Sequence, residues 1–238
     1  MVDGNGENIG RRIEAIRAAL RAAARRAGRD ASSVRLLAAT KTVSVDRVRT
    51  ALAAGLRLFG ENRLQEAMPK IEALASEPIE WHFIGRLQRR KVKQVVGRFA
   101  LIHSVDSVEL AEEINRRAEG AGLIQPVLLE VNVAGEASKG GFAPHTVAEI
   151  LPALAAMPHL SVRGLMTIPP YTEDPEGSRS AFRSLRALSV ELSRKGMAGM
   201  AFDELSMGMS NDFAVAVEEG ATIVRIGTAL FGARPQTE

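Results

Sequence analysis

The residue whose type and position most invite a chemical explanation is Lys41, which directly follows the short apolar run 34–40. A run of this length is typical of a buried strand, and it would place an amine at the mouth of an apolar interior. Desolvation of an ammonium is costly and lowers its pKa toward the reactive free base. An edge strand that ends in water would explain the same lysine without chemistry. The stretch alone therefore leaves both interpretations of Lys41 open.

Small and polar residues gather in two late segments of the chain. S-M-G-M-S occupies 206–210, with Ser206 and Ser210 at its ends, and Gly227-Thr228 follows a short apolar run. The backbone N–H groups of such turns, beside the start of a helix, commonly bind phosphate. Either segment alone is explained by an ordinary turn, but together they favour a phosphate site.

A guanidinium interrupts the apolar run T-I-V-R-I-G, at Arg225. Strand parity places Arg225 on the same side as Gly227, and a buried arginine needs an acceptor. That acceptor is either a nearby carboxylate such as Glu130 or a ring nitrogen of a bound heterocycle. Pyridoxal 5'-phosphate (PLP) matches all three features, because its aldehyde suits Lys41, its phosphate suits the two turns and its pyridine nitrogen suits Arg225.

The elements that would position these residues alternate regularly. An amphipathic helix over 9–27, ended by Gly28, precedes an alternation of strands and helices. The strand candidates are 34–40, 57–59, 81–84, 100–103, 127–133, 162–168, 203–207 and 222–226. This pattern predicts an α/β fold, a single (β/α)8 TIM barrel with an extra N-terminal helix. A doubly wound sheet is the alternative, but the glycine fingerprint that it would need after the first strand is absent.

In a barrel, residues just past the strands converge on one face. That expectation brings Lys41, Asn62, Met166 and the two late turns together. Two local predictions concern the connections: a helix over 87–96, and a capping pair of Asp106 and Glu109 for the next helix.

Length and composition are those of an ordinary globular protein. The 238 residues are 46% hydrophobic and 25% charged, so we expect one domain over 1–238, with a disordered tail at 1–8, a second tail at 234–238 and a monomeric state. No apolar run approaches the roughly 20 residues of a membrane helix. The first residues are polar and acidic rather than basic and then apolar, so we expect no secretory signal and a cytoplasmic location.

The same composition argues against several classes of site. The absence of cysteine excludes disulfides, thiolate metal sites and cysteine nucleophiles. The four histidines have no tight metal-ligand spacing, so we expect no metal. Arginines are plentiful but base-stacking aromatics are few, and we expect no nucleic-acid binding.

The chain also resembles a known family in motifs spread from about Ile9 to Arg234. These motifs are L-L-A-A-T-K-T-V, L-F-G-E-N-R-L-Q-E, W-H-F-I-G-R-L-Q, H-S-V-D-S, E-V-N-V-A-G-E-A-S-K-G-G-F, V-R-G-L-M-T-I-P, L-S-M-G-M-S-N-D-F and V-R-I-G-T-A-L-F-G-A-R. They resemble the pyridoxal phosphate homeostasis protein family, whose members look like the barrel half of bacterial alanine racemase. Arg90 departs from the asparagine more usual in that family at its position.

The resemblance implies a PLP-binding barrel of fold type III. It implies that the cofactor forms a Schiff base with Lys41 and that Arg225 faces the pyridine nitrogen. It also implies phosphate binding by Ser210, Gly227 and Thr228, with Ser206, and a pocket lined by Asn62 and Met166.

The chemistry of the expected site favours a carrier over an enzyme. An arginine opposite the pyridine nitrogen does not readily give up a proton, so the ring stays neutral and is a weak electron sink. A two-base racemase also needs a second proton donor, and the single tyrosine, Tyr171, belongs to the loop after 162–168. His82 has two interpretations, stacking on the ring or hydrogen bonding in the core.

Our hypothesis is therefore a non-catalytic protein that buffers PLP or delivers it to apo PLP-dependent enzymes. The alternatives are a PLP-dependent amino-acid racemase of low activity and a PLP-free lyase that forms a Schiff base between Lys41 and a phosphorylated sugar. The loop 135–142, which contains Lys139, either takes part in cofactor transfer or is an ordinary solvent loop.

Overall fold

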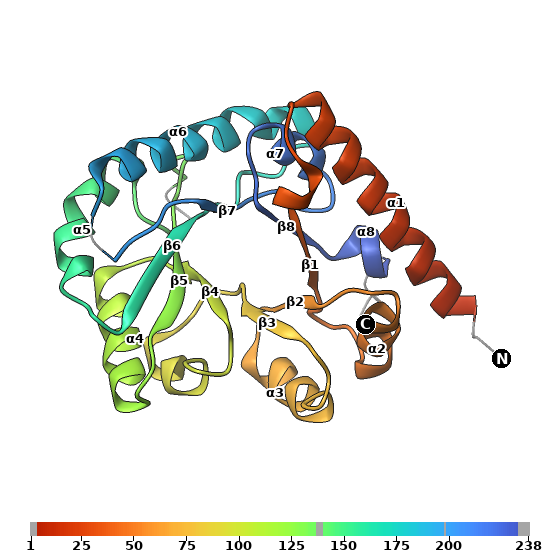
Figure 1. Cartoon of the computed structure of the whole chain (residues 1–238), viewed down its shortest axis with the longest axis horizontal. Helices are drawn as coiled ribbons and strands as arrows, with labels where there is room; N and C mark the ends of the chain where they lie inside the picture. The colour runs from red at the N-terminus through yellow and green to blue at the C-terminus, as the bar shows by residue number, and fades with distance from the viewer. Residues whose placement is uncertain (1–3, 137–139, 198, 233–238) are drawn as a thin grey trace.

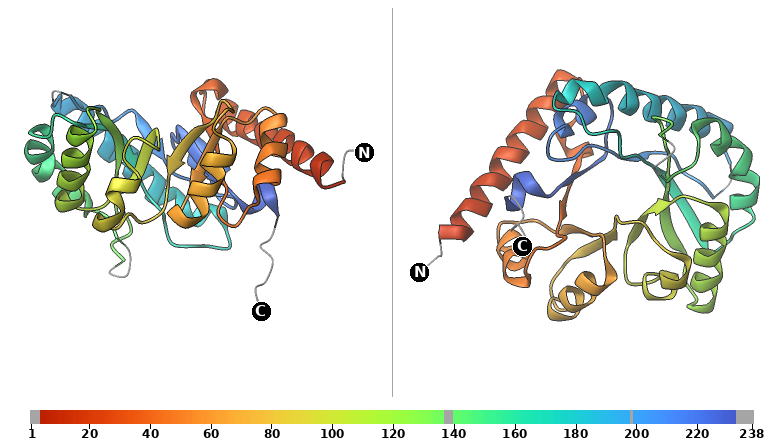
Figure 2. Two further views of the ribbon diagram at one scale, coloured as in Figure 1. Left: turned by 90° about the horizontal axis from the view of Figure 1, so that it is seen from below. Right: turned by 180° about the vertical axis from the view of Figure 1, so that it is seen from behind.

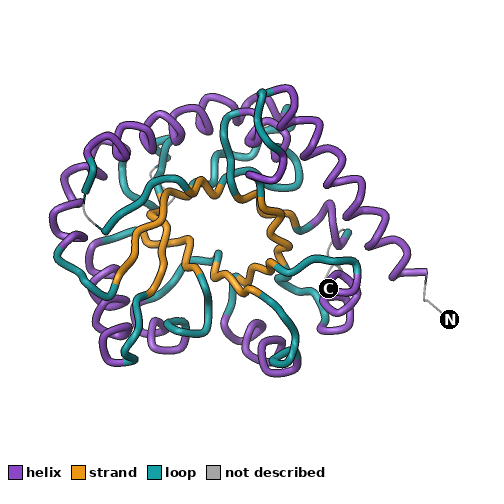
Figure 3. Tube along the Cα trace, in the orientation of Figure 1, coloured by secondary structure: helices purple, strands orange, loops and turns teal. Residues whose placement is uncertain are grey.

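Eight parallel strands form a closed barrel in chain order, and the helices lie outside it (Figures 1 and 3). The computed structural model describes residues 4–136, 140–197 and 199–232. The strands are β1 (Arg35–Ala39), β2 (Leu58–Glu61), β3 (Glu80–Phe83), β4 (Leu101–Val105), β5 (Gln125–Glu130), β6 (Leu160–Met166), β7 (Glu204–Ser206) and β8 (Ile223–Ile226). The predicted TIM barrel is confirmed, and each of the eight strand candidates corresponds to one strand.

The helices follow the strands in the expected alternation. The α-helices are α1 (Gly4–Arg26), α2 (Val45–Ala53), α3 (Leu64–Ala73), α4 (Val108–Gly120), α5 (Val147–Ala155), α6 (Arg179–Lys195), α7 (Phe213–Glu218) and α8 (Thr228–Phe231). The 3-10 helices are η1 (Ala31–Ser33), η2 (Arg89–Gln94), η3 (Pro144–Thr146) and η4 (Pro175–Ser178). Among the helices described, none is long and apolar enough to cross a membrane.

Strand parity separates an inner core from an outer one. In β1, Leu37 and Ala39 belong to the small cluster inside the barrel, whereas Ala38 belongs to the large cluster between strands and helices. Ile223 lies in the inner cluster, so Arg225, two residues later, also points inward. The parity argument for Arg225 is thereby confirmed.

Helix α1 covers the seam where the first and last strands pair. It packs against α2, α7 and α8 on the outside of the barrel (Figures 1 and 2). Ile9, Ile13 and Ile16 form its buried stripe, and β1 pairs with β8 beneath it. The helix begins at Gly4 and so includes residues 4–8 of the tail predicted over 1–8, whereas residues 1–3 lie outside the described residues. The predicted tail at 234–238 lies outside the described residues.

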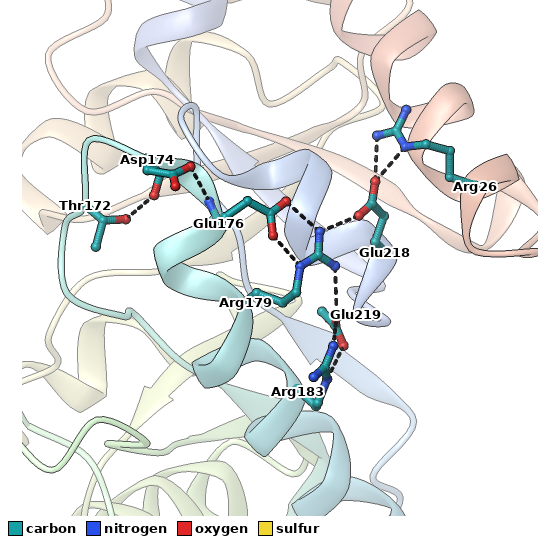
Figure 4. Close-up of polar contacts among 8 residues, drawn as sticks. All are labelled: Arg26, Thr172, Asp174, Glu176, Arg179, Arg183, Glu218 and Glu219. Carbon is teal, nitrogen blue, oxygen red and sulfur yellow. Dashed lines mark hydrogen bonds and ion pairs between the residues drawn. The ribbon is translucent and has the colours of Figure 1, made fainter.

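A network of ion pairs holds α7 between α6 and α1 (Figure 4). Arg179 contacts Glu218 at 2.7 Å and Glu219 at 2.9 Å, and Arg26 of α1 also pairs with Glu218, at 2.7 Å. Several charges that share partners stabilise a surface more than isolated pairs do. The network matters for the site because α7 directly follows the segment 206–212.

Two local predictions were wrong. The segment 87–96 contains the shorter 3-10 helix η2 and not a helix over its whole length. Leu87, Val92, Val95 and Val96 are all buried, but four polar residues, 88–91, interrupt the apolar stripe that a longer helix needs. Helix α4 is capped by Ser107, whose Oγ accepts from the N–H of Leu110 at 3.3 Å, and not by Asp106. A serine hydroxyl at this position satisfies an otherwise unpaired N–H.

Candidate functional site

A cavity of about 500 Å³ opens at the carboxyl ends of the strands. It is lined by Ala39, Lys41, Asn62, Ile84, Ile168, Pro169, Pro170, Tyr171, Thr172, Met209, Ser210, Asn211, Asp212, Arg225, Gly227 and Thr228. Six of the eight predicted site residues are in this lining: Lys41, Asn62, Ser210, Arg225, Gly227 and Thr228. The size is typical of a pocket for a cofactor or another small molecule.

Lys41 is presented by a tightly held turn at the end of β1. The preceding residue, Thr40, donates its N–H to Gly60 O at 2.9 Å and is fully buried. The following residue, Thr42, has φ 62°, which is unusual for a side chain branched at Cβ, and its N–H donates to Glu66 at 2.7 Å. Backbone strain of this kind persists where surrounding contacts fix it, and it gathers at functional sites.

A buried ion pair supports the same turn from below. The Nζ of Lys70 donates to Thr40 O and to Glu61 Oε1, both at 2.7 Å, and the hydroxyl of Thr40 donates to the same Glu61 oxygen at 2.6 Å. Burial raises the pKa of Glu61, while its hydrogen bonds with Lys70 and Thr40 oppose that rise. Removal of either charge would leave its partner buried and unpaired, so the pair fixes the position of the backbone that carries Lys41.

Asn62 brings an unpaired acceptor to the cavity. Its Oδ1 is buried and has no hydrogen-bond partner among the described residues. The backbone of Asn62 packs against Gly85, where a Cβ would lie 2.2 Å from Asn62 O. A buried carbonyl oxygen without a partner is costly, and a ligand that donates a hydrogen bond to it would remove that cost.

The two late turns meet at the other side of the cavity. Ser210 Oγ accepts from the N–H of Ala229 at 3.1 Å, which ties the loop after β7 to the first turn of α8. Asp212 orders the same loop, since it accepts from the N–H of Met209 at 2.7 Å and from Ser178 at 3.0 Å. A Cβ added at Gly227 would have no atom closer than Ala39 O at 3.5 Å. Packing within the protein therefore does not require glycine at this position. The absence of a side chain instead leaves the backbone N–H groups of the turn accessible to a ligand.

Arg225 lies at the floor of the cavity and is 5% exposed. It donates to Ser206 Oγ at 2.5 Å and to Thr167 O at 2.9 Å. Among the described residues the hydrogen-bond acceptors of Arg225 are therefore a hydroxyl and a carbonyl, and Glu130 acts on the guanidinium only through longer-range electrostatics. Burial lowers the pKa of Arg225 to about 10, with Asp212 and Glu130 opposing, and the guanidinium remains charged at neutral pH.

Below Arg225, a chain of hydrogen bonds runs through the barrel. Ser206 Oγ lies 2.8 Å from His103 Nδ1, His103 Nε2 lies 2.9 Å from His82 Nδ1, and His82 Nε2 lies 2.7 Å from Glu80 Oε1. Its ends set its direction, because Arg225 only donates and the ionised Glu80 only accepts. We therefore assign the proton of each histidine to Nε2, with the hydroxyl of Ser206 donating to His103.

Both histidines of this hydrogen-bond chain stay neutral chiefly because they are buried. Burial lowers the pKa of His82, which its hydrogen bond with Glu80 opposes. The pKa of His103 falls well below its usual value, first through burial and then through repulsion from His82 and Arg225. His82 is a hydrogen-bonded core histidine, and it is absent from the cavity lining, so it does not stack on a ligand there.

Two predicted site residues lie one layer deeper than expected. Ser206 is fully buried between His103 and Arg225, so it supports the arginine and does not line the phosphate side of the cavity. Met166 is 1% exposed and packs in the inner cluster with Ala39. Both face inward as strand parity requires, but neither belongs to the lining.

Other residues were missed or underrated by sequence reasoning. Tyr171 lines the cavity although it is 81% exposed, which places it at the rim. The pairing of Glu61 with Lys70 gave no recognisable signal, because an isolated lysine in a helix usually faces water. Pro169 and Pro170, which follow the predicted strand 162–168, also line the cavity. Lys139 lies outside the described residues.

Comparison with known proteins gives consistent matches over nearly the whole chain. The family model described as "Alanine racemase, N-terminal domain" matches residues 12–235. The pyridoxal phosphate homeostasis protein of Aquifex aeolicus is 49% identical over 227 residues, which cover 95% of this chain and 99% of that protein.

Solved structures agree. PipY of Synechococcus elongatus, solved with PLP bound, superposes with a TM-score of 0.83 at 36% identity and covers 94% of this chain and 100% of its own. Alanine racemase of Clostridium difficile has a TM-score of 0.72 at 17% identity over 97% of this chain and 57% of its own, which is a likeness of fold. The chain therefore belongs to the pyridoxal phosphate homeostasis protein family and, more broadly, to the alanine racemase N-terminal domain family.

Proposed function

We propose that this protein binds PLP as a Schiff base on Lys41 and buffers or delivers the cofactor without catalytic turnover. One observation carries the proposal: a single cavity is lined by the amine of Lys41, by the guanidinium of Arg225, and by the turn residues Ser210, Gly227 and Thr228. The names of the relatives and the PLP bound by PipY support the same cofactor.

Each group of the cofactor has a partner of suitable chemistry in the lining. When bound, PLP supplies an electrophilic aldehyde and an electron-poor ring. Lys41 provides the amine for the aldehyde, and Ser210, Gly227 and Thr228 provide hydroxyl and N–H donors for the phosphate. Asn62 Oδ1 offers an acceptor with no partner of its own among the described residues, which suits a donor group on the ring.

Arg225 favours a carrier over an enzyme. A guanidinium has five N–H groups, and those not used for Ser206 and Thr167 remain for the pyridine nitrogen. Because Arg225 stays protonated, it donates to that nitrogen and leaves the ring neutral, which weakens the ring as an electron sink.

Borohydride reduction tests the attachment. The protein is loaded with PLP, freed of excess cofactor, reduced and digested, and its peptides are weighed. We expect a pyridoxyl group on Lys41 and none on the buried Lys70, whose Nζ is already bonded to Thr40 and Glu61. A modified peptide without Lys41 would contradict the proposal, and so would an adduct with a sugar phosphate in place of PLP.

A racemase of low activity is the second candidate, and the position of Tyr171 on the cavity lining favours it. The test follows the exchange of the α-proton of alanine with deuterated water in the PLP-loaded protein. We expect no sustained exchange. Turnover that Tyr171→Phe abolishes would establish the racemase and overturn the carrier.

The proposal also includes a monomeric protein in the cytoplasm that passes PLP to apo PLP-dependent enzymes. Light scattering after size-exclusion chromatography tests the monomer. Reactivation of an apo-enzyme by the loaded protein, at a rate that exceeds release of PLP into buffer, tests delivery; equal rates would leave only the buffering role.

A further inference from the structure

A second cavity lies at the opposite, amino ends of the strands. Its volume is about 500 Å³, and its walls come from α1, the turn before β1 and the starts of β1, β2 and β3. We call it the basal cavity; its lining is Arg17, Leu20, Arg21, Ala31, Ser32, Val34, Arg35, Leu36, Gly55, Leu56, Arg57, Leu58 and Glu80. None of these residues lines the cofactor cavity, so the proposed function does not account for it.

The charged part of the basal cavity is strongly cationic. Four guanidiniums and one carboxylate line it: Arg17, Arg21, Arg35, Arg57 and Glu80. Arg35 pairs with Glu80 at 3.2 Å and with Glu204 at 2.9 Å, and is thus neutralised locally. The remaining three arginines, of which only Arg17 has a carboxylate partner within the described residues, the exposed Glu14, leave an excess of positive charge around the cavity.

Arg17, Arg21 and Arg57 each have guanidinium N–H groups that make no hydrogen bond within the described residues. Arg21 has no hydrogen bond or ion pair within the described part of the chain. Arg57 donates through one nitrogen to two backbone carbonyls, Leu52 O and Leu56 O, and has no carboxylate partner there. Arg17 donates to Gly55 O at 3.2 Å and pairs with the exposed Glu14. Their planar N–H groups match the oxygens of phosphate or carboxylate.

Apart from Ser32 and Gly55, the rest of the lining is apolar. It consists of Leu20, Ala31, Val34, Leu36, Leu56 and Leu58. A cavity with an aliphatic wall and a few charged groups fits a ligand with an apolar body and an anionic end better than it fits a free inorganic ion. The volume is also larger than a lone phosphate needs.

We propose that the basal cavity is a second ligand site, which takes a phosphate monoester that carries an apolar or aromatic group. The phosphate lies among Arg17, Arg21 and Arg57, and the apolar group packs on the leucines. The lining contains no lysine, so this ligand is held reversibly and without a Schiff base. The inference is independent of the proposed function, because no residue is shared between the two linings.

Calorimetric titration with phenyl phosphate tests the proposal. The protein is first loaded with PLP and reduced with borohydride, so that the cofactor cavity is closed to the probe, and the absorbance of the pyridoxyl group verifies the loading separately. We expect one site that binds phenyl phosphate about tenfold tighter than inorganic phosphate, because the ring adds apolar burial. Equal affinities would overturn the assignment of an organic ligand, and no binding would overturn the site.

Matched charge reversals locate the site. Arg21 and Arg25 are both exposed on α1, one turn apart, but only Arg21 lines the basal cavity. Arg21→Glu is expected to weaken phenyl phosphate about tenfold or more, because it replaces a donor by a like charge. Arg25→Glu changes the net charge of the protein equally and is expected to leave the affinity nearly unchanged. An equal loss of affinity in both variants would show that phenyl phosphate is attracted by the overall positive charge of the protein and not by this cavity, and would overturn the proposal.

Discussion

At the scale of single residues, the site depends on side chains whose types conflict with their surroundings. Lys41 ends an apolar strand, Arg225 interrupts another, and Asn62 buries an oxygen with no partner among the described residues. The first two could be predicted because charge within an apolar run is visible in sequence. The chain of Ser206, His103 and His82 could not, because it joins three strands whose register was unknown.

Because Asn62 Oδ1 has no partner among the described residues, replacing Asn62 should affect stability and PLP affinity in opposite directions. In Asn62→Leu the buried acceptor disappears, so the free energy of unfolding of the PLP-free protein should rise by about 1 kcal/mol. The affinity for PLP should fall, because the proposed contact between Asn62 Oδ1 and the ring would be lost. Urea unfolding and PLP titration measure the two effects. Loss of stability with unchanged affinity would show that Asn62 is only a packing residue.

His103 predicts a pH dependence of stability. Its pKa in the folded protein lies well below 6.5, the value expected in the unfolded chain, so the unfolded state takes up the proton first as the pH falls. The contribution of His103 is therefore complete above pH 6.5 and is lost as the pH drops below it. The slope is about 1.4 kcal/mol per pH unit for one proton.

Urea unfolding between neutral and mildly acid pH measures this slope. His103→Gln is expected to be less stable at neutral pH but to depend less steeply on pH than the wild-type protein. The exposed His145 supplies the control, since His145→Gln should keep the wild-type slope. An unchanged slope in His103→Gln would contradict the neutral, buried state assigned to His103.

At the scale of elements, apolar runs and their breakers predicted the strands well. Each of the eight runs became a strand, although β5 ends at Glu130, three residues before the end of the predicted run. The segment 87–96 is not a helix over its whole length, because four polar residues separate Leu87 from Val92 and interrupt the apolar stripe. Residue types predicted the short polar turns. They did not predict the hydrogen bond between the N–H of Ala229 and Ser210 Oγ, which joins two different turns.

The turn between β8 and α8 gives the prediction at this scale. Gly227→Ala should leave the stability within about 0.5 kcal/mol, because the added methyl group meets only ordinary contacts in the protein. The PLP affinity should fall about tenfold or more, because the methyl group would occupy the proposed phosphate site.

A second glycine provides the control for that experiment. Gly10→Ala lies within α1, where a Cβ meets nothing within 4 Å, and it should stabilise the protein by about 0.5–1 kcal/mol without changing PLP affinity. Thermal unfolding and PLP titration report the two quantities. A strong loss of stability in Gly227→Ala with normal PLP affinity would show that the glycine serves the fold and not a ligand.

At the scale of the whole molecule, closure of the barrel makes the site. Residues 41 and 227 are far apart in sequence, yet β1 pairs with β8, with Ala38 opposite Ile226, so both line one cavity. The count of alternating strands and helices predicted this closure from sequence. The basal cavity was not predicted, because it forms where α1 covers the other ends of the strands, a docking that local periodicity does not encode.

The visible absorption of the PLP-loaded protein tests the central claim most directly. The wild-type protein, incubated with PLP and desalted, should keep a visible band of the protonated Schiff base; Lys41→Ala should lose it while remaining folded by circular dichroism. Lys93→Ala, which removes an exposed lysine from η2, should retain the band in full. An unchanged band in Lys41→Ala would contradict the assignment of Lys41 as the residue that holds the cofactor.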